Sequence, residues 1–337
     1  MAETGLDVAI IGATGAVGAD LVEALGRSSL PVARWILVAS AHKNHSRVTV
    51  RDQEILVLPC PDDAVPQVVL DDADLVIFAA PSSVTRKLAP AVQEAGIAII
   101  DVGGALVDRG SLAVPLAGVP VDEERFHDQR VVCSPSAPTV LAAAVLRPLT
   151  ALGLVRAQVT ALLPAGVVGR AGAEELSRQV VSLFNSADPP RKVFPDGLAF
   201  DVVNALGTPV DDWTGAERRV SAELAALLRI PPARLPVTLV LIPTFAGLSM
   251  GIHAQLTGER GAEQVRGALA ALPTITLADP MTSPKESVGS AVAHVGRVRD
   301  DPGGLGVHLW AVADNLRFCA SANVVGIAMQ LWRNDLL

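Results

Sequence analysis

Three glycines near the start of the chain, Gly12, Gly15 and Gly18, have the spacing of a loop that holds phosphate groups. Glycines at such positions permit a tight turn, let the backbone approach a pyrophosphate and allow a helix to pack closely on a strand. The loop follows the apolar run 7–11 and precedes a stretch of helical periodicity. In that context the motif predicts a dinucleotide site with the helix N-terminus facing the phosphates, formed by Gly12, Thr14, Gly15, Ala16 and Val17. The alternative is a loop that only packs tightly and binds nothing.

The end of the predicted second strand, 35–39, bears on which dinucleotide binds. NAD sites usually carry a carboxylate there, about 20 residues after the glycine loop, which binds the ribose 2′-hydroxyl. This chain has Ser40-Ala41-His42-Lys43 at that place and no acidic residue. A hydroxyl at Ser40 and basic side chains at His42 and Lys43 can receive a 2′-phosphate, which favours NADP. An ordinary solvated loop at His42 and Lys43 is an equally open interpretation.

Thiols are candidate nucleophiles, and the chain has three, at Cys60, Cys133 and Cys319. Their wide spacing predicts neither a disulfide framework nor a zinc site. Cys60 and Cys133 fall at the ends of predicted buried strands, where an apolar setting keeps a thiol protonated and inert. All three are therefore expected to be structural.

Histidine is the usual general base. His253 is expected to be packed or on the surface. His127, His294 and His308 have no Asp, Cys or His partner at ligand spacing along the sequence, so no metal site is predicted.

The elements that position these residues alternate in the first part of the chain. Strands are predicted at 7–11, 35–39, 74–80, 97–101 and 131–133, with helices at 17–25, 84–95 and 140–149. This order predicts an α/β fold with a Rossmann-type, doubly wound parallel sheet that binds its ligand at the carboxyl ends of the strands. The predicted dinucleotide-binding domain covers 1–136, with 319–337 packing back onto it.

Residues 137–318 follow a different pattern, with predicted strands at 158–163, 236–242, 253–256 and 308–313 between helices and loops rich in Pro and Asp. This pattern predicts an α+β catalytic-type or dimerisation domain with a mostly antiparallel sheet. The net charge of −8 gives no general attraction to nucleic acid or anionic lipid. No apolar run reaches the ~20 residues of a membrane span. With an acidic N-terminus unlike a secretory signal, a cytoplasmic protein is expected.

Several segments in collinear order resemble the aspartate-β-semialdehyde dehydrogenase family along nearly the whole chain. They are 12–18, 37–41, 78–90, 94–96 with 100–101, 170–176, 194–195 with 198–200, 295–299, and 312–317 with 322–323. The resemblance implies a dimeric NADP-binding fold and the reversible conversion of 4-aspartyl phosphate to aspartate 4-semialdehyde. It also implies cofactor contacts at Ala80 and Asn315. Pro81 replaces a glycine of the family beside the cofactor, which removes backbone freedom there.

The family's catalytic positions carry other residue types in this chain. The reaction needs a thiolate nucleophile, a general base and cations that orient the substrate. Aligned on Pro135 and on Arg147-Pro148-Leu149, the nucleophile falls on Ala137. The active-site Gln, Arg and His fall on Leu163, Leu241 and Leu248, and a nearby Glu falls on Met250.

Two arginines bear on whether any anion site survives. Arg219 falls where the family has a phosphate-binding Lys. Arg109 falls near a phosphate-binding Arg only if a two-residue insertion follows Leu106; otherwise that position is Val107. The simpler interpretation of both is a surface arginine.

Three functions remain open. The leading one is a catalytically silent homodimeric paralogue with NADP binding, a pseudoenzyme resembling the Usg-type branch that lacks the catalytic cysteine. The second is an active NADP-dependent aspartate-semialdehyde dehydrogenase, which needs either a route without that cysteine or a different alignment around Pro135. The third is a structural or interaction subunit that has lost the cofactor.

Overall fold

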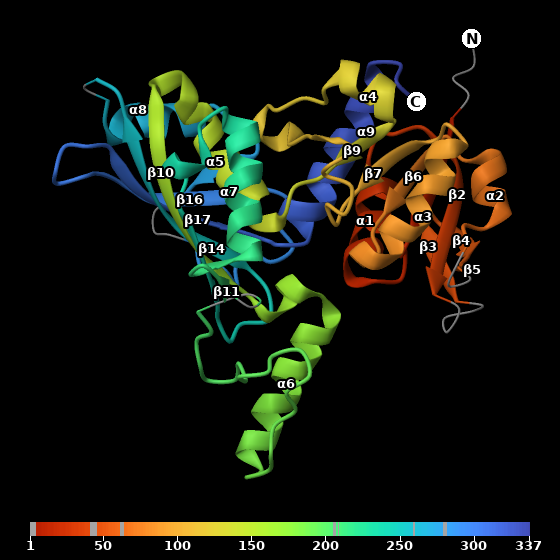
Figure 1. Cartoon of the computed structure of the whole chain (residues 1–337), viewed down its shortest axis with the longest axis horizontal. Coiled ribbons are helices and arrows are strands. Elements are labelled where there is room, and N and C mark those ends of the chain that lie inside the picture. Colours follow the sequence, from red (N-terminus) through yellow and green to blue (C-terminus); the bar gives the residue numbers. More distant parts are fainter. Residues whose placement is uncertain are drawn as a thin grey trace. The chain divides into compact units, whose positions relative to one another are not determined.

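The computed structural model describes residues 5–40, 46–60, 64–204, 207, 209–258, 260–278 and 282–337. The chain divides into two compact units, residues 1–136 with 320–337 and residues 137–319. Their elements are labelled in Figure 1.

The first unit is built on a seven-stranded sheet in the order β5-β2-β1-β6-β7-β9-β8, in which every pairing is parallel. Its strands are β1 (Leu6–Ile11), β2 (Val32–Ser40), β5 (Leu58–Cys60), β6 (Leu75–Phe78), β7 (Ala98–Asp101), β8 (Ser111–Leu112) and β9 (Val131–Cys133). Its helices are α1 (Ala16–Arg27), α2 (Gln67–Asp72), α3 (Ser82–Glu94), α4 (Glu123–Gln129) and α9 (Asn323–Arg333), and β3 (Arg47–Val50) and β4 (Gln53–Leu56) form a hairpin.

The parallel strands are aliphatic runs because both of their faces are covered. Successive side chains of β1 alternate between two cores, as the period of a strand requires. Val8 and Ile10 pack with residues of α1 and α9. Ala9 and Ile11 pack with residues of α2 and α3 on the other face. This is the expected doubly wound arrangement, and the C-terminal helix belongs to it.

The second unit is built on a six-stranded mixed sheet in the order β13-β10-β14-β17-β16-β15. The three central pairings are antiparallel, and the pairing at each edge is parallel. The strands are β10 (Leu154–Leu163), β13 (Val237–Leu241), β14 (Leu248–Leu256), β15 (Ile275–Leu277), β16 (Ala293–Asp300) and β17 (Val307–Ala313). The other elements are α5 (Ala137–Leu149), α6 (Arg170–Phe184), α7 (Gly215–Leu228), α8 (Ala262–Ala270) and the short strands β11 (Pro209–Val210) and β12 (Trp213–Thr214).

One face of this sheet is covered by helices and the other is partly open. Leu248, Met250 and Ile252 of β14 are buried, whereas Gly251 and His253, which point to the opposite face, are half-buried. Helix α5 packs against the central strands β10, β14 and β17 and against α7. We call the face that carries Gly251 and His253 the open face.

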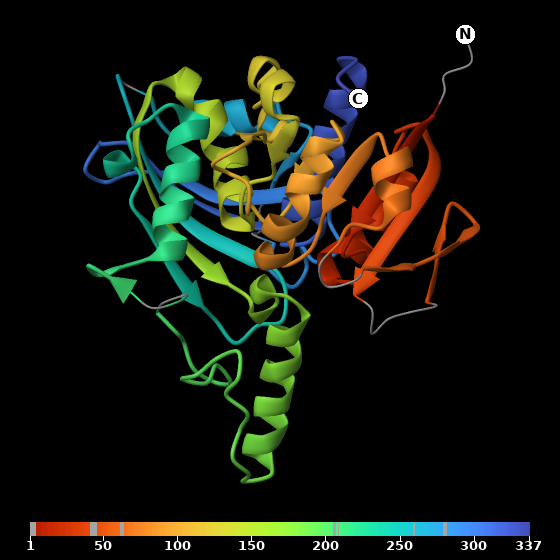
Figure 2. The same cartoon turned by 45° about the vertical axis from the view of Figure 1, so that its right-hand side comes forward.

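Helix α6 extends away from the sheet of the second unit, as both views show (Figures 1 and 2). Buried Glu175 fastens the returning chain to it by accepting the backbone N–H groups of Lys192, Val193 and Phe194. These hydrogen bonds hold the pKa of Glu175 below its usual value, although burial acts in the opposite direction. In the described part of the chain, no helix is long and apolar enough to cross a membrane.

Candidate functional site

The glycine loop lies between β1 and α1 and is fixed by close backbone contacts. The N–H groups of Gly12 and Ala13 both donate to the carbonyl of Val38 in β2. Gly12 has a φ of 95°, and a Cβ built on it would lie 2.4 Å from the carbonyl oxygen of Ala79. A Cβ on Gly18 would lie 2.1 Å from the carbonyl oxygen of Gly12. Glycine is therefore required at both positions. At Gly12 both the backbone conformation and the lack of space require it, and at Gly18 the lack of space alone does.

The N-terminus of α1 is suited to an anion. Gly15 is its N-cap residue, so no side chain caps the helix, and the first turn carries no acidic residue. The first N–H groups of a helix have no acceptor within it, and the helix dipole favours negative charge there. The loop thus has the features that a pyrophosphate needs.

A cavity of about 360 Å³ opens beside this loop, within the first unit. Thr14 and Ser40 give it hydroxyl groups, and the rest of its lining is largely apolar, from Ile11, Ala39, Cys60, Ala79, Ala80, Pro81, Val84 and Leu88 together with Gly12 and Gly15. The volume is in the range of small-molecule pockets, and the position, at the carboxyl ends of parallel strands, is where this fold binds ligands. Four residues of the predicted cofactor site, besides Gly12 and Gly15, fall here or nearby: Thr14, Ser40 and Ala80 in the lining, and Ala16 at the start of α1.

The remaining predicted cofactor residues are placed differently. Val17 lies in the first turn of α1, whereas His42 and Lys43 lie outside the described residues. Asn315 belongs to the second unit, where its side-chain oxygen accepts the N–H of Gly247 at 3.1 Å. Cys60 was not expected in the cavity: the sequence shows it only as a buried strand end, and its pairing opposite Ser40 brings it to the site.

Three of the positions aligned with catalytic residues form one row across the second sheet. Leu163 of β10 pairs with Leu241 of β13. The pairing of β10 with β14 runs to Leu162 opposite Ser249, so its next step brings Leu163 beside Leu248. The three side chains are 0%, 3% and 0% exposed, respectively. We call them the leucine row, and Met250, also fully buried, follows Leu248 on the same face.

Ala137, the fourth position, is the first residue of α5, the helix that packs on β10 and β14. It is only half-buried. A helix N-terminus is a setting that activates a thiolate, because the dipole stabilises its charge. Here the position carries a methyl group, which cannot attack a carbonyl or hold a covalent intermediate.

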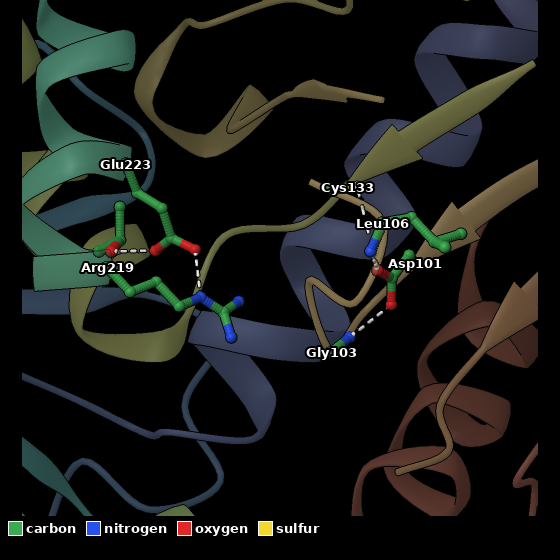
Figure 3. A network of polar contacts seen from close by, with 7 residues as sticks. Asp101, Gly103, Leu106, Cys133, Arg219 and Glu223 are labelled. Carbon is green, nitrogen blue, oxygen red and sulfur yellow. Dashed lines mark hydrogen bonds and ion pairs between the residues drawn. The ribbon is translucent and has the colours of Figure 1, made fainter. Parts of the chain in front are cut away.

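Arg219 is tied into a polar network at the start of α5, and does not stand as an isolated surface cation. Its Nε donates to Glu223 Oε1 at 2.7 Å, and Thr139 Oγ1 donates to Glu223 Oε2 at 2.5 Å (Figure 3). Glu223 is 3% exposed, so its carboxylate needs these partners. Glu223 and Thr139 were not predicted as site residues, although Arg219 and Glu223 are spaced one helical turn apart, which favours a salt bridge between them. Arg109, in the first unit, is exposed and donates to Gln93.

Cys133 and Cys319 are both buried. Cys133 is fully buried at the end of β9, with its sulfur 4.0 Å from the carboxylate of Asp101 (Figure 3). Asp101 in turn accepts the N–H groups of Gly103 and Leu106. Cys319 is 1% exposed, and its pKa is raised well above the usual value, first by burial and then by the charge of Asp314. Both thiols therefore have the buried, structural setting that the sequence predicts for them.

His308 has two partners in the structure, although none stands at ligand spacing along the sequence. His308 Nε2 lies 3.0 Å from Asp301 Oδ1, and the His308 ring stacks on that of His253 with centroids 4.4 Å apart. Strand register brings them together, since His253 of β14 pairs with His308 of β17. His253 lies on the open face, five residues from Leu248, or about 17 Å along the strand. It therefore cannot act as the base for a reaction at the leucine row.

Comparison with known families divides the chain as the two sheets do. Residues 7–129 match the semialdehyde dehydrogenase NAD binding domain, and residues 146–318 match the semialdehyde dehydrogenase dimerisation domain. The chain belongs to the semialdehyde dehydrogenase family.

Relatives within the semialdehyde dehydrogenase family include two kinds of protein. A USG-1 protein homolog of Azotobacter vinelandii is 34% identical, over 96% of this chain and 96% of its own. An aspartate-semialdehyde dehydrogenase of Legionella pneumophila is 29% identical, over 98% of this chain and 97% of its own. The crystal structure of aspartate semialdehyde dehydrogenase II of Vibrio cholerae complexed with ASA superposes with a TM-score of 0.91 at 27% identity, covering 98% of this chain and 99% of that one. The predicted family and fold are thus confirmed.

Proposed function

We propose that the chain is a catalytically silent semialdehyde dehydrogenase paralogue that retains dinucleotide binding. The leucine row carries the proposal. The positions aligned with a Gln, an Arg and a His are adjacent in space, buried and apolar. With Ala137 at the nucleophile position, the proposed former active site offers no thiolate, no general base and no cation for a carboxylate.

A substrate would be poorly bound as well as unreacted. Aspartate semialdehyde and its acyl phosphate carry anionic groups, and burying an unpaired charge against leucine side chains is strongly unfavourable. Arg219, which aligns with a phosphate-binding Lys of the family, is engaged with the buried carboxylate of Glu223. We infer that this network fastens α7 to the start of α5 and that its positive charge is largely neutralised within the protein.

For the cofactor we propose NADP. The two close-approach glycines, the uncapped N-terminus of α1 and the cavity with Thr14 and Ser40 fit the pyrophosphate and one nucleoside of a dinucleotide. The residues after β2 lack the carboxylate that would bind an NAD ribose. A bound nicotinamide dinucleotide supplies hydride transfer in dehydrogenases; in this chain it would remain without a covalent substrate intermediate to accept hydride from.

The test of cofactor binding is a thermal-shift titration. We expect NADP to raise the melting temperature, because a ligand of the folded state adds RT ln(1 + [L]/Kd), or about 2.7 kcal/mol at a hundredfold excess over Kd. NAD at the same concentration should give a smaller shift. A chain that responds to neither dinucleotide would be the structural subunit without cofactor, and the proposal of retained binding would be withdrawn.

We further propose that two copies of the chain associate through the open face of the second sheet. Trp310 of β17 is half-buried there, between Gly251 and Gly296 of the neighbouring strands. Its ring lies 3.5 Å from the place of a Cβ on Gly251, which is van der Waals contact distance, so the ring lies over that glycine. Leu162 and Val240 are also half-buried on this face. A flat face with aromatic and aliphatic groups suits an isologous interface.

We expect Trp310→Glu to convert a dimer to monomers in sedimentation velocity, because the two-fold axis would bring two carboxylates into a desolvated interface. Trp213→Glu is the matched control, since Trp213 is a 39% exposed tryptophan of the same unit outside this sheet. The control should remain dimeric. A wild-type chain that sediments as a monomer at all concentrations would exclude this interface.

A further inference from the structure

Three side chains with metal-ligand chemistry meet on the open face of the second sheet. His253 of β14 and His308 of β17 are register partners, so their side chains stand next to each other on the same face. Asp301 begins the hairpin loop between β16 and β17, where its N–H donates to the carbonyl of Gly306. The loop folds its carboxylate back over His308. We call these three residues the His-Asp cluster.

The spacing within the cluster is close to that of a coordination shell. One ligand atom from each of the three side chains lies within 4.8 Å of the others, and the pair formed by His308 Nε2 and Asp301 Oδ1 is at 3.0 Å. Donor atoms about 2.0–2.2 Å from a tetrahedral zinc ion are themselves roughly 3.3 Å apart. Binding of an ion would draw the more distant ligand atoms together from separations of up to 4.8 Å.

His253 supplies an independent sign that the cluster is incomplete as a hydrogen-bond network. Its Nε2 is buried, and among the described residues no group hydrogen-bonds to it. A buried polar nitrogen without a partner is costly, and such groups in native proteins call for an explanation by a water or an ion. The stacking on His308 satisfies the ring faces but not this nitrogen.

The pKa shifts of two of the three ligands, His253 and Asp301, lie in the direction that favours metal binding, whereas His308 Nε2 must exchange its hydrogen bond to Asp301 for the ion. Burial, then His308, then Arg156 lower the pKa of His253 against the attraction of Asp301, which favours a neutral imidazole with a free lone pair. The hydrogen bond from His308 lowers the pKa of Asp301, which keeps the carboxylate ionised. Arg299 is the other charged register partner, opposite His308 on β16.

We propose that the imidazoles of His253 and His308 and the carboxylate of Asp301 bind a divalent transition-metal ion of the zinc class. Two nitrogens and one carboxylate oxygen are a ligand set for such an ion, with further positions for water. The ion ties β14 to the β16–β17 hairpin on the face opposite the leucine row. The site needs ligands from a single chain only, and it does not depend on the proposed cofactor binding. It lies on the open face beside Trp310, so in the proposed dimer a bound ion and the second chain would be neighbours.

The test uses the full, untagged chain after removal of metal with a chelator. Zinc titrated at neutral pH should bind one ion per chain and raise the melting temperature, and Co²⁺ should give the visible absorption of a low-coordinate site. His253→Gln, His308→Gln and Asp301→Asn should each weaken zinc binding by about tenfold or more. Binding should also weaken below the usual histidine pKa of about 6.5, where protons compete for the imidazoles.

His294→Gln is the matched control, because His294 lies on β16 and its Nδ1 is near Thr282, outside the cluster. It should bind zinc like the wild type. The melting temperatures of all variants in chelator establish that each is folded before its affinity is compared. Wild-type chain that takes up no zinc, or variants that bind as tightly as wild type, would make the cluster a stacked histidine pair with a structural hydrogen bond and overturn the proposal.

Discussion

The purified chain should not reduce NADP when supplied with aspartate semialdehyde and phosphate. In a well-studied hydrolase, loss of the covalent nucleophile alone lowers kcat by about 10⁶-fold. In the proposed function, Ala137 occupies the nucleophile position and the leucine row occupies the positions of the three polar partners. The measurement is the formation of NADPH, with the Legionella pneumophila relative as the positive control. We expect a rate at the uncatalysed background.

The variant Cys133→Ser tests whether the chain is catalytically inactive or uses Cys133 as its nucleophile in place of a cysteine at position 137. Because Cys133 is fully buried beside Asp101, the substitution should leave the background rate unchanged. A measurable rate that this variant abolishes would show that an active enzyme works through Cys133, and the proposed silence would be wrong.

Restoring the chemistry needs more than a thiol. Ala137→Cys should place a reactive sulfur at the N-terminus of α5, where a maleimide labels it while the three native cysteines, all buried, react slowly. Yet this variant should show no turnover, because base and cations are still missing. Leu163→Gln, Leu241→Arg and Leu248→His would have to be added together.

The second large effect should come from Gly12→Ala. The new Cβ would meet the carbonyl of Ala79, and the φ of 95° is unfavourable for any residue with a side chain. Strain and overlap together should destabilise the chain by about 2–6 kcal/mol and remove the NADP thermal shift. Denaturant unfolding measures the loss of stability, and the thermal-shift titration with NADP measures the loss of binding.

Gly96→Ala is the matched control for this substitution. Gly96 has a φ of 74°, but a Cβ there would meet no atom within 4 Å. It should therefore show only the cost of the left-handed conformation, about 1–2 kcal/mol, with NADP binding intact. Equal losses for the two variants would mean that the close approach of Gly12 to Ala79, the residue after β6, has no energetic role.

The strands of the first unit can be predicted from the sequence because they are buried on both faces and are therefore continuous apolar runs. A run such as Leu75-Val76-Ile77-Phe78 can hardly be anything but an interior strand when helical patterns flank it. The strands of the second unit are harder to predict from the sequence. Strand β16 contains an irregularity between Gly296 and Arg299, and Arg297 has a φ of 51°, so polar and apolar residues do not alternate along it. β14 starts at Leu248, five residues before the predicted strand, because Ser249 and Gly251 weaken the apolar pattern.

The leucine row and the His-Asp cluster of the second unit also differ in how far the sequence predicts them. The leucine row was found through the family resemblance, and its members are adjacent because they end or begin neighbouring strands. The His-Asp cluster has no local signature, since spacing along the chain carries no information about which residues pair across strands. His253 and His308 meet only through register, and Asp301 only through the hairpin.

The burial of the leucine row also bears on whether evolution can reverse the loss. Leu241→Arg alone would bury an unpaired guanidinium at a 3% exposed position, at a cost of about 3 kcal/mol or more. Leu248→His and Leu163→Gln would likewise place polar atoms in a packed core. None of these substitutions restores catalysis until all are present. Each one alone therefore lowers stability without a gain in activity, and selection acts against it. If the proposed function is correct, a lineage with leucine at these three positions has no stepwise route back to the enzyme.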